Sequence, residues 1–116
     1  MSLLVKELIK LGVLRKGKVL LTSGNVSNFY VDLKIANGYP RVLKLMSAGL
    51  ARYLTKNTTC IASIGYGGIP LATAVALKNN LKLSLIRKEP RKHGSKKLIE
   101  GYVPNKKDRV VVVDDV

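Results

Sequence analysis

A run of four valines, Val110 to Val113, followed by Asp114 and Asp115, is the feature that most constrains how this chain folds. Consecutive β-branched apolar residues are typical of a strand that is buried on both faces of a parallel sheet. Open α/β sheets bind ligands beside the carboxyl ends of their strands, which is where the two aspartates would lie. The sequence therefore predicts a parallel sheet with a ligand site at that edge. The alternative is an ordinary turn after the strand, where aspartate is common.

Composition narrows the class of protein. The chain has 116 residues, 47% of them hydrophobic, which is enough for one domain with a modest core. No apolar run approaches the roughly 20 residues of a membrane span. The single cysteine, Cys60, excludes an internal disulfide framework and indicates a reducing compartment such as the cytoplasm. One cysteine and one histidine also cannot form an ordinary zinc site.

The charge is strongly positive. Lysine and arginine number 21 against 7 acidic residues, a net charge of +14. Such an excess favours polyanionic partners, either small phosphorylated ligands or nucleic acid. Nucleic acid ranks below a phosphorylated ligand, because the chain has only 5 tyrosines and 1 phenylalanine and they do not alternate with the basic residues. An acidic segment beyond Val116 would make the imbalance an artefact, and this reading stays open.

Periodicity and turn residues predict the order of elements. In the first half we expect a helix over 3–11, a basic turn over 15–18, an apolar stretch over 19–22, a turn over 23–28, a half-buried antiparallel strand over 29–35, and a helix from Pro40 to about Lys56. In the second half we expect a strand over 60–64, a glycine turn over 65–68, a helix over 69–78, a strand over 83–86, a polar stretch over 87–107 and a strand over 109–113. This alternation predicts parallel strands joined by right-handed crossovers.

The glycine turn over 65–68 joins a predicted strand to a predicted helix. Glycines at such a turn let backbone N–H groups approach a phosphate, and the positive end of the helix dipole favours its charge. It is not a dinucleotide fingerprint, because Pro70 occupies the third glycine position, and no P-loop sequence is present. The alternative is a tight turn that needs glycine only for steric reasons.

A basic segment, Arg87 to Gly94, begins where the next strand ends. Five of its eight residues, including His93, are able to carry positive charge. Departing pyrophosphate needs such cations, because its charge develops in the transition state. The alternative is a solvated loop with an idle histidine.

These motifs, in this order, resemble those of orotate phosphoribosyltransferases, type I enzymes of pyrimidine synthesis, and the resemblance covers nearly the whole chain. The RKEP, HG and IEG sequences that begin at Arg87, His93 and Ile99 set this arrangement apart from purine phosphoribosyltransferases. The other matching segments are Leu21–Gly24 with Phe29–Asp32, similar to the family's N-terminal orotate segment; Gly67–Ala72, similar to its pyrophosphate turn; and Val110–Val116, similar to the first half of its phosphoribosyl pyrophosphate (PRPP) motif.

The resemblance implies an α/β fold, a type I phosphoribosyltransferase-like parallel sheet flanked by helices. It implies one domain over 1–116, in which 1–36 form an N-terminal hood and 37–116 form the core, with a mobile loop over 88–100. Only Val116 follows the half motif, so we expect the domain to be incomplete at its C-terminus and this polypeptide to be inactive alone.

The same resemblance implies the chemistry. Magnesium-bound PRPP and orotate would react to give orotidine 5′-monophosphate and pyrophosphate, and the loop would close over the neighbouring subunit's site in a homodimer. The implied catalytic residues are Arg91, Lys92 and His93. The implied PRPP and pyrophosphate residues are Arg87, Lys88, Tyr66, Gly67, Gly68, Asp114 and Asp115. The implied orotate residues are Thr22, Ser23, Gly24, Phe29 and Tyr30. Magnesium would arrive with PRPP, with Asp114 and Asp115 as candidate ligands.

Two departures from the family pattern affect these roles. The loop usually reads lysine, acidic residue, histidine, whereas here it reads Arg91, Lys92 and His93, so Lys92 is expected to take part of the lysine's role. Asn25 stands where a basic residue is common. Two other functions remain open: transfer to another base, and a non-catalytic regulator that binds nucleic acid, which the charge of +14 would suit.

Overall fold

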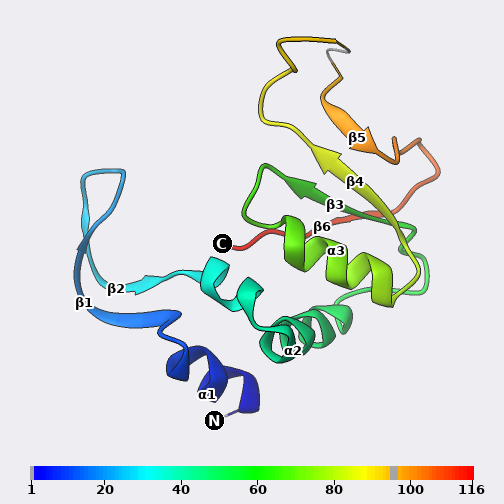
Figure 1. The fold of residues 1–116 in the computed structure, drawn as a ribbon. Helices are drawn as coiled ribbons and strands as arrows, with labels where there is room; N and C mark the ends of the chain where they lie inside the picture. Colours follow the sequence, from blue (N-terminus) through cyan, green and yellow to red (C-terminus); the bar gives the residue numbers. More distant parts are fainter. Residues whose placement is uncertain (1, 95–96) are drawn as a thin grey trace. The chain divides into compact units, whose positions relative to one another are not determined.

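The computed structural model divides the chain into two compact units, Met1–Leu45 and Met46–Val116. The structure describes residues 2–94 and 97–116, and only the backbone at Lys16 and Val19. Figure 1 traces the order of elements along the chain. The elements are α1 (Leu3–Lys10), β1 (Leu14–Leu20), β2 (Val26–Val31), the 3-10 helix η1 (Leu33–Gly38), α2 (Pro40–Ala51), β3 (Cys60–Ile64), α3 (Ile69–Lys78), β4 (Lys82–Ile86), β5 (Ile99–Gly101) and β6 (Val110–Val112).

The first unit is built around a short helix and a hairpin. The Ser2 hydroxyl caps α1 by accepting a hydrogen bond from the Val5 N–H at 3.2 Å. Gly12, with a φ of +77°, ends the helix in the left-handed conformation that glycine adopts readily. β1 and β2 then pair antiparallel, with an irregularity between Lys16 and Val19. The predicted helix is therefore confirmed, and the predicted basic turn over 15–18 lies instead within β1.

The second unit is a four-stranded sheet in the order β5-β4-β3-β6. β3 pairs parallel with both β4 and β6, while β5 pairs antiparallel with β4. Helix α3 connects β3 to β4 and packs against both strands (Figure 1). Its buried residues meet the buried central strand in the core: Leu71, Ala72, Val75 and Ala76 from α3, and Cys60, Ile61, Ala62 and Ser63 from β3. Because β3, β4 and β6 run in one direction, their carboxyl ends lie at one edge of the sheet.

The valine strand occupies an edge of this sheet. Its parallel pairing confirms the prediction, but burial on both faces is wrong, because Val110 is 41% and Val112 is 55% exposed. Alternate residues of a strand point to opposite faces, so these two exposed valines lie on the same face of the sheet. The other face is better covered, and Val113 just beyond the strand is buried.

Helix α2 is shorter than its apolar pattern predicts. It ends at Ala51 rather than near Lys56. Thr55, Asn57 and Thr58 then form a local turn, in which the Thr55 N–H donates to the Thr58 hydroxyl at 3.1 Å and the Asn57 N–H donates to the Thr55 hydroxyl at 3.2 Å. Threonine hydroxyls thus compete with the helical hydrogen bonds and end the helix early.

Three further boundaries differ from the sequence-based expectation. β2 begins at Val26 and ends at Val31, and the residues from Leu33 form η1 rather than a strand, because the Asp32 carboxylate caps that helix at the Lys34 N–H. β4 begins one residue earlier than predicted, at Lys82. The polar stretch over 87–107 contains the short antiparallel strand β5, so the sheet is mainly and not wholly parallel.

Among the described residues, no helix is long and apolar enough to cross a membrane.

Candidate active site at the carboxyl edge of the sheet

The glycine turn and the two aspartates meet at the carboxyl edge of β3 and β6. A Cβ atom at Gly68 would lie 2.8 Å from the Asp114 Cα and 2.9 Å from the Val113 carbonyl oxygen. A Cβ atom at Gly67 would lie 2.8 Å from the Asp115 carboxyl carbon. Backbone atoms thus oppose a side chain at Gly68, whereas only the Asp115 side chain opposes one at Gly67, so glycine lets the two segments approach closely. The structure brings together two predicted site motifs that are more than 40 residues apart in the sequence.

Lys88 reaches the same turn from β4. A Cβ atom at Gly65 would lie 2.9 Å from the Lys88 Cε, so the aliphatic part of this lysine lies on the glycine. Gly65 has a φ of +75°, and its N–H donates to the Ile86 carbonyl oxygen at 3.0 Å. The turn is thus fastened to the end of β4, and the Lys88 ammonium is delivered to the edge where the backbone N–H groups of the turn gather.

An open groove of about 940 Å³ adjoins this turn. Its lining residues come from the glycine turn, the end of β4 and the basic loop: Gly65, Tyr66, Ile69, Leu85, Ile86, Arg87, Lys88, Glu89, Pro90, Lys92 and Glu100. The volume is in the range of small-molecule sites, and the mainly apolar lining carries three of the predicted cations, Arg87, Lys88 and Lys92. An anionic ligand of the size of a sugar phosphate would fit this groove.

The basic loop is closed at its base by backbone hydrogen bonds. The Arg87 N–H donates to the Leu98 carbonyl oxygen at 2.7 Å, and its Nε donates to the Glu89 carbonyl oxygen at 3.3 Å. Lys92 and His93 are exposed beyond this base, and Ser95 and Lys96 of the predicted mobile loop lie outside the described residues. The loop thus projects from a fixed stem formed by β4 and β5.

Arg91 has an acidic partner that the sequence reasoning missed. Its Nη1 lies 3.5 Å from the Glu100 Oε1, and both side chains are partly exposed. Glu100 also lines the groove. A separation of nine residues matches neither helical nor strand spacing, so the sequence did not indicate this pair. The two side chains approach each other because β5 pairs back onto β4.

The predicted orotate residues lie on the β1–β2 hairpin but not together. Thr22, Ser23 and Gly24 form the turn, closed by hydrogen bonds from the Leu21 N–H to the Asn25 carbonyl and from the Gly24 N–H to the Leu21 carbonyl. Phe29 and Tyr30 pair with Lys16 and Arg15 near the other end of the hairpin. Four residues, Asn25 to Asn28, separate the two groups along the chain. Phe29 is 58% and Tyr30 38% exposed.

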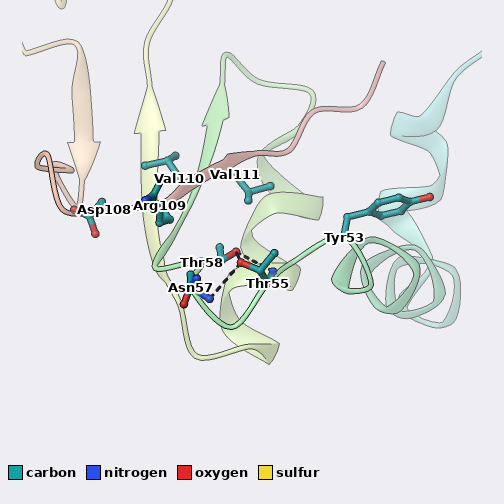
Figure 2. Close-up of a pocket in the computed structure, with 8 residues that line it drawn as sticks. All are labelled: Tyr53, Thr55, Asn57, Thr58, Asp108, Arg109, Val110 and Val111. Atoms are coloured by element: carbon teal, nitrogen blue, oxygen red, sulfur yellow. Dashed lines mark hydrogen bonds between the residues drawn. The ribbon is translucent and has the colours of Figure 1, made fainter.

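A polar cluster holds the opposite, amino-terminal edge of the sheet. The Asp108 carboxylate accepts hydrogen bonds from the Tyr102 hydroxyl at 2.6 Å, the Thr59 hydroxyl at 2.7 Å and the Asn105 N–H at 2.9 Å. These bonds, led by the Tyr102 hydroxyl, lower the pKa of Asp108 to about 2. The hydrogen bond to Asp108 is also the main reason why the pKa of Tyr102 is raised. Figure 2 shows Asp108 and its surroundings at this edge, where a cavity of about 460 Å³ opens.

The carboxyl edge offers few metal ligands of its own. Within residues 2–94 and 97–116, no three histidine, cysteine or acidic side chains gather to enclose a metal ion. Magnesium is commonly held by one or two carboxylates together with substrate phosphates and waters. Asp114 and Asp115, beside the glycine turn, suit that mode and not a cage made wholly of protein ligands.

Known proteins with similar sequences include orotate phosphoribosyltransferases. The chain is 36% identical over 115 residues to that of Methanocaldococcus jannaschii, and the match covers 99% of this chain and 65% of that relative. It is 42% identical over 113 residues to that of Methanothermobacter thermautotrophicus, covering 97% of this chain and 62% of that relative. The chain thus spans less than two thirds of the length of these curated relatives. No protein-family model matches the chain.

Solved structures give the same result for the fold. The orotate phosphoribosyltransferase of Aeropyrum pernix superposes with a TM-score of 0.78 at 30% identity, covering 97% of this chain and 64% of that one. The Mycobacterium tuberculosis enzyme, solved in complex with PRPP, superposes with a TM-score of 0.69 at 26% identity, covering 97% and 62% of the two chains. Over nearly its whole length, therefore, the chain is a homologue of the orotate phosphoribosyltransferases and has the α/β fold of that part of them.

Proposed function

We propose that this chain carries the PRPP-binding part of an orotate phosphoribosyltransferase, the enzyme that makes orotidine 5′-monophosphate for UMP synthesis. The observation that carries the proposal is the convergence at one sheet edge of the Gly65–Gly68 turn, Lys88 and the Asp114–Asp115 pair. That edge offers backbone donors and a cation for phosphate oxygens, and carboxylates for hydroxyls or a metal.

The proposed reaction exchanges one bond for another at C1′ of the ribose. The bond from C1′ to the pyrophosphate oxygen breaks, and pyrophosphate leaves with the electron pair. Orotate N1, having lost its proton, donates its own pair to C1′ and forms the new bond. The transition state resembles an oxocarbenium ion, so the chain's task is to stabilise the charge that develops on pyrophosphate.

Each group of residues would bind the part of PRPP that lies nearest to it. Arg87, Lys88 and the N–H groups of the Tyr66–Gly68 turn would bind pyrophosphate, since they border the same groove or turn. Asp114 and Asp115 would accept hydrogen bonds from the ribose hydroxyls. Magnesium, bound with PRPP, would neutralise part of the pyrophosphate charge, with these two aspartates as its protein ligands.

The loop would supply the remaining cations. Arg91, Lys92 and His93 would close over bound PRPP, with His93 as a proton donor to the departing group, and closure would reach the partner's site in a homodimer. Support comes from the fixed stem at Arg87 and Leu98, which leaves the loop anchored at its ends. The PRPP complex of the M. tuberculosis homologue supports PRPP as the ligand.

The hairpin of the first unit would contribute to orotate. Phe29 and Tyr30 offer aromatic faces for a flat heterocycle, and the turn at Thr22–Gly24 offers hydroxyl and backbone donors for its carboxylate. Because four residues separate the two groups on the hairpin, they would contact different parts of the bound substrates.

The proposal is tested by variants in a protein that extends to the full length of the relatives. Activity is followed as loss of orotate absorbance with magnesium and PRPP. Lys88→Ala, Lys92→Ala and His93→Ala should each lower kcat on the order of 10²-fold while orotate binding changes little, since the charge acts in the transition state. Lys106→Ala, in an exposed loop at the opposite edge, is the matched control and should retain activity.

Two results would contradict the assignment. Full activity in both Lys92→Ala and His93→Ala would remove the loop from the mechanism. No turnover by the full-length protein, with turnover of a purine base instead, would favour the other-base reading.

A nucleic-acid-binding regulator is the second candidate, favoured by the net charge of +14. Filter binding of generic RNA and DNA at two salt concentrations separates the two functions. A regulator would bind at physiological salt, with an affinity that falls steeply as salt rises.

A further inference from the structure

Five exposed basic side chains lie at the amino-terminal edge of the sheet in the second unit, opposite the candidate active site. These amino-edge cations are Lys78 and Lys82, at the two ends of the turn that joins α3 to β4, and Lys106, Lys107 and Arg109, in the segment between β5 and β6. Figure 2 shows Arg109 at this edge beside Asp108, the one acidic residue within 78–82 and 102–109. Five cations against one carboxylate leave a net charge of +4, and the proposed reaction uses none of these residues.

A tight turn presents two of the cations. The Asp108 N–H donates to the Asn105 carbonyl oxygen at 3.0 Å, which makes Lys106 and Lys107 the central residues of a four-residue turn. The Lys107 N–H also donates to the Asn105 Oδ1 at 2.8 Å. Because the Asp108 carboxylate accepts a hydrogen bond from the Thr59 hydroxyl at the start of β3, the turn is fastened to the sheet and the two lysines lie at a fixed tip.

The spacing of the edge matches that of a phosphate backbone. β4, β3 and β6 are neighbours in the sheet, with Lys82 opposite Cys60 and Cys60 opposite Val110. Neighbouring strands lie about 4.8 Å apart, so the first residues of β4 and β6 are about 10 Å apart across the sheet. Along one strand of a nucleic-acid duplex, about 10 Å of axis carries about three phosphates. The edge therefore presents its cations over a length that several consecutive phosphates would occupy.

The chemistry of the edge favours phosphates over the carboxylates of a protein partner. Four of the five cations are lysines, a residue in which protein–protein interfaces are depleted. Within residues 2–94 and 97–116, none of the five forms an ion pair that would occupy its charge. The exposed Asn80 and Asn105 add amides, which commonly contact phosphate and sugar oxygens. Contact with a duplex backbone needs no aromatic stacking, so the sparse aromatic residues of this chain argue against single strands only.

We propose that the amino-edge cations form a contact surface for the phosphate backbone of duplex nucleic acid, independent of base sequence. Binding of this kind has a Kd on the order of 10⁻⁴–10⁻⁶ M at physiological salt, which is weaker than the binding of a regulator that recognises one sequence. The inference goes beyond the proposed function and does not rest on it, because the two edges of the sheet would bind their ligands separately.

The salt dependence of binding counts the phosphate contacts. The probes are labelled DNA and RNA duplexes of one sequence, and binding to the 116-residue chain is read by fluorescence anisotropy. If each of the five cations neutralises one phosphate, the affinity for the DNA duplex should fall about 500-fold between about 50 and 200 mM salt, a log–log slope of about −4.5. Both duplexes should bind, since both offer the backbone, and the tighter of the two identifies the cellular source.

Paired variants locate the surface. Lys106→Gln together with Lys107→Gln removes two cations from the turn and should make the slope shallower by about 1.8. Lys106→Arg together with Lys107→Arg keeps the charge and should bind like the original chain. Lys6→Gln together with Lys10→Gln, at exposed positions of α1 in the first unit, lowers the net charge equally and should leave the slope nearly unchanged.

Three outcomes would overturn the proposal. Equally shallow slopes in the two glutamine pairs would show that only net charge matters. Loss of duplex binding when pyrophosphate is added at constant ionic strength would place the nucleic acid at the carboxyl edge. Equally tight binding of polyglutamate of the same charge would make an acidic protein the partner. Orotate turnover is measured separately in the full-length protein, so a failure of the proposed reaction leaves the binding result intact.

Discussion

At the scale of single residues, the carboxyl edge depends on the absence of side chains at the turn. The obstacle at Gly68 is backbone, the Asp114 Cα and the Val113 carbonyl oxygen, whereas the obstacle at Gly67 is a carboxylate that is able to rotate. A methyl group at position 68 would therefore have to displace backbone, whereas one at position 67 would displace only the Asp115 side chain.

Gly68→Ala should destabilise the protein by about 1–3 kcal/mol, because β6 or the turn must move to admit the methyl group. Gly67→Ala should cost less, since only the Asp115 side chain must move. Gly49→Ala in α2, where a Cβ atom meets nothing within 4 Å, is the control and should stabilise by about 0.5–1 kcal/mol. Urea unfolding of the three variants measures the order, and equal effects at positions 67 and 68 would contradict it.

The Arg91–Glu100 pair makes a second prediction at this scale. If Arg91 binds pyrophosphate, Glu100 competes for it, so Glu100→Gln should strengthen pyrophosphate binding. The gain should be less than about tenfold, because partly exposed ion pairs contribute little. Glu7→Gln is the matched control, since Glu7 pairs with Arg41 at 3.9 Å in the first unit. Titration calorimetry with pyrophosphate measures both, and weaker binding by Glu100→Gln would show that Glu100 helps to form the site.

At the scale of elements, the Asp108 cluster fastens the segment between β5 and β6 to the start of β3. The Thr59 hydroxyl donates to Asp108 and also accepts from the Arg109 N–H at 3.0 Å. The Lys82 ammonium lies 4.3 Å from the centre of the Tyr102 ring. Charge and hydrogen bonding here hold in place the strand whose far end carries Asp114 and Asp115.

This cluster should make stability depend on pH in acid. The pKa of Asp108 is lowered to about 2 in the folded chain from an ordinary value of 3.8, so its contribution is present above about pH 4 and is lost as pH falls toward 2. Asp108→Asn should lower the urea midpoint near neutrality. Between about pH 4 and pH 2, the urea midpoint of this variant should fall less than that of the wild type. A wild-type midpoint that falls no more steeply than that of the variant would contradict the assignment.

The loop makes a prediction for amide exchange. Described residues from Arg91 to Gly94 carry no apolar side chain that would anchor them. Their amides should exchange fast in the free chain and slow when PRPP or pyrophosphate is added. Exchange that is slow before any ligand is added would count against a lid.

The sequence predicted β3, α3 and β4 nearly residue by residue, because each has a strong local pattern bounded by glycine or asparagine. It also placed Gly67 with Gly68, and Asp114 with Asp115, after two strands of one predicted parallel sheet, and parallel strands place their carboxyl ends together. It missed β5, whose three residues form a strand only by pairing with β4. It overstated the burial of Val110 and Val112, since four valines in a row do not reveal what covers each face. The predicted hood and core stay predictions.

At the scale of the whole molecule, charge and exposed apolar surface act against each other. The net charge of +14 keeps copies apart, while the exposed Val110 and Val112 on the edge strand β6 favour association. Salt screens the repulsion but leaves the apolar surface unchanged.

The isolated chain should therefore be marginally stable and should aggregate more as salt rises. Val112→Lys should suppress this aggregation, because it places a charge on the exposed edge strand. Leu77→Lys on α3, a residue that is 81% exposed, adds the same charge elsewhere and should have a smaller effect. Light scattering across a salt series compares them. A monodisperse chain with a cooperative melt at high temperature would contradict this expectation.

The central claim is that the carboxyl edge of β3, β4 and β6 binds the phosphoribosyl substrate. The most direct test is a titration of the isotope-labelled chain with magnesium and PRPP, read by backbone chemical shifts. The account predicts that the largest changes fall on Gly65 to Gly68, Lys88, Asp114 and Asp115, with Thr59 and Asp108 at the opposite edge nearly unchanged. Changes spread over all basic segments, or centred on the Asp108 edge, would contradict it.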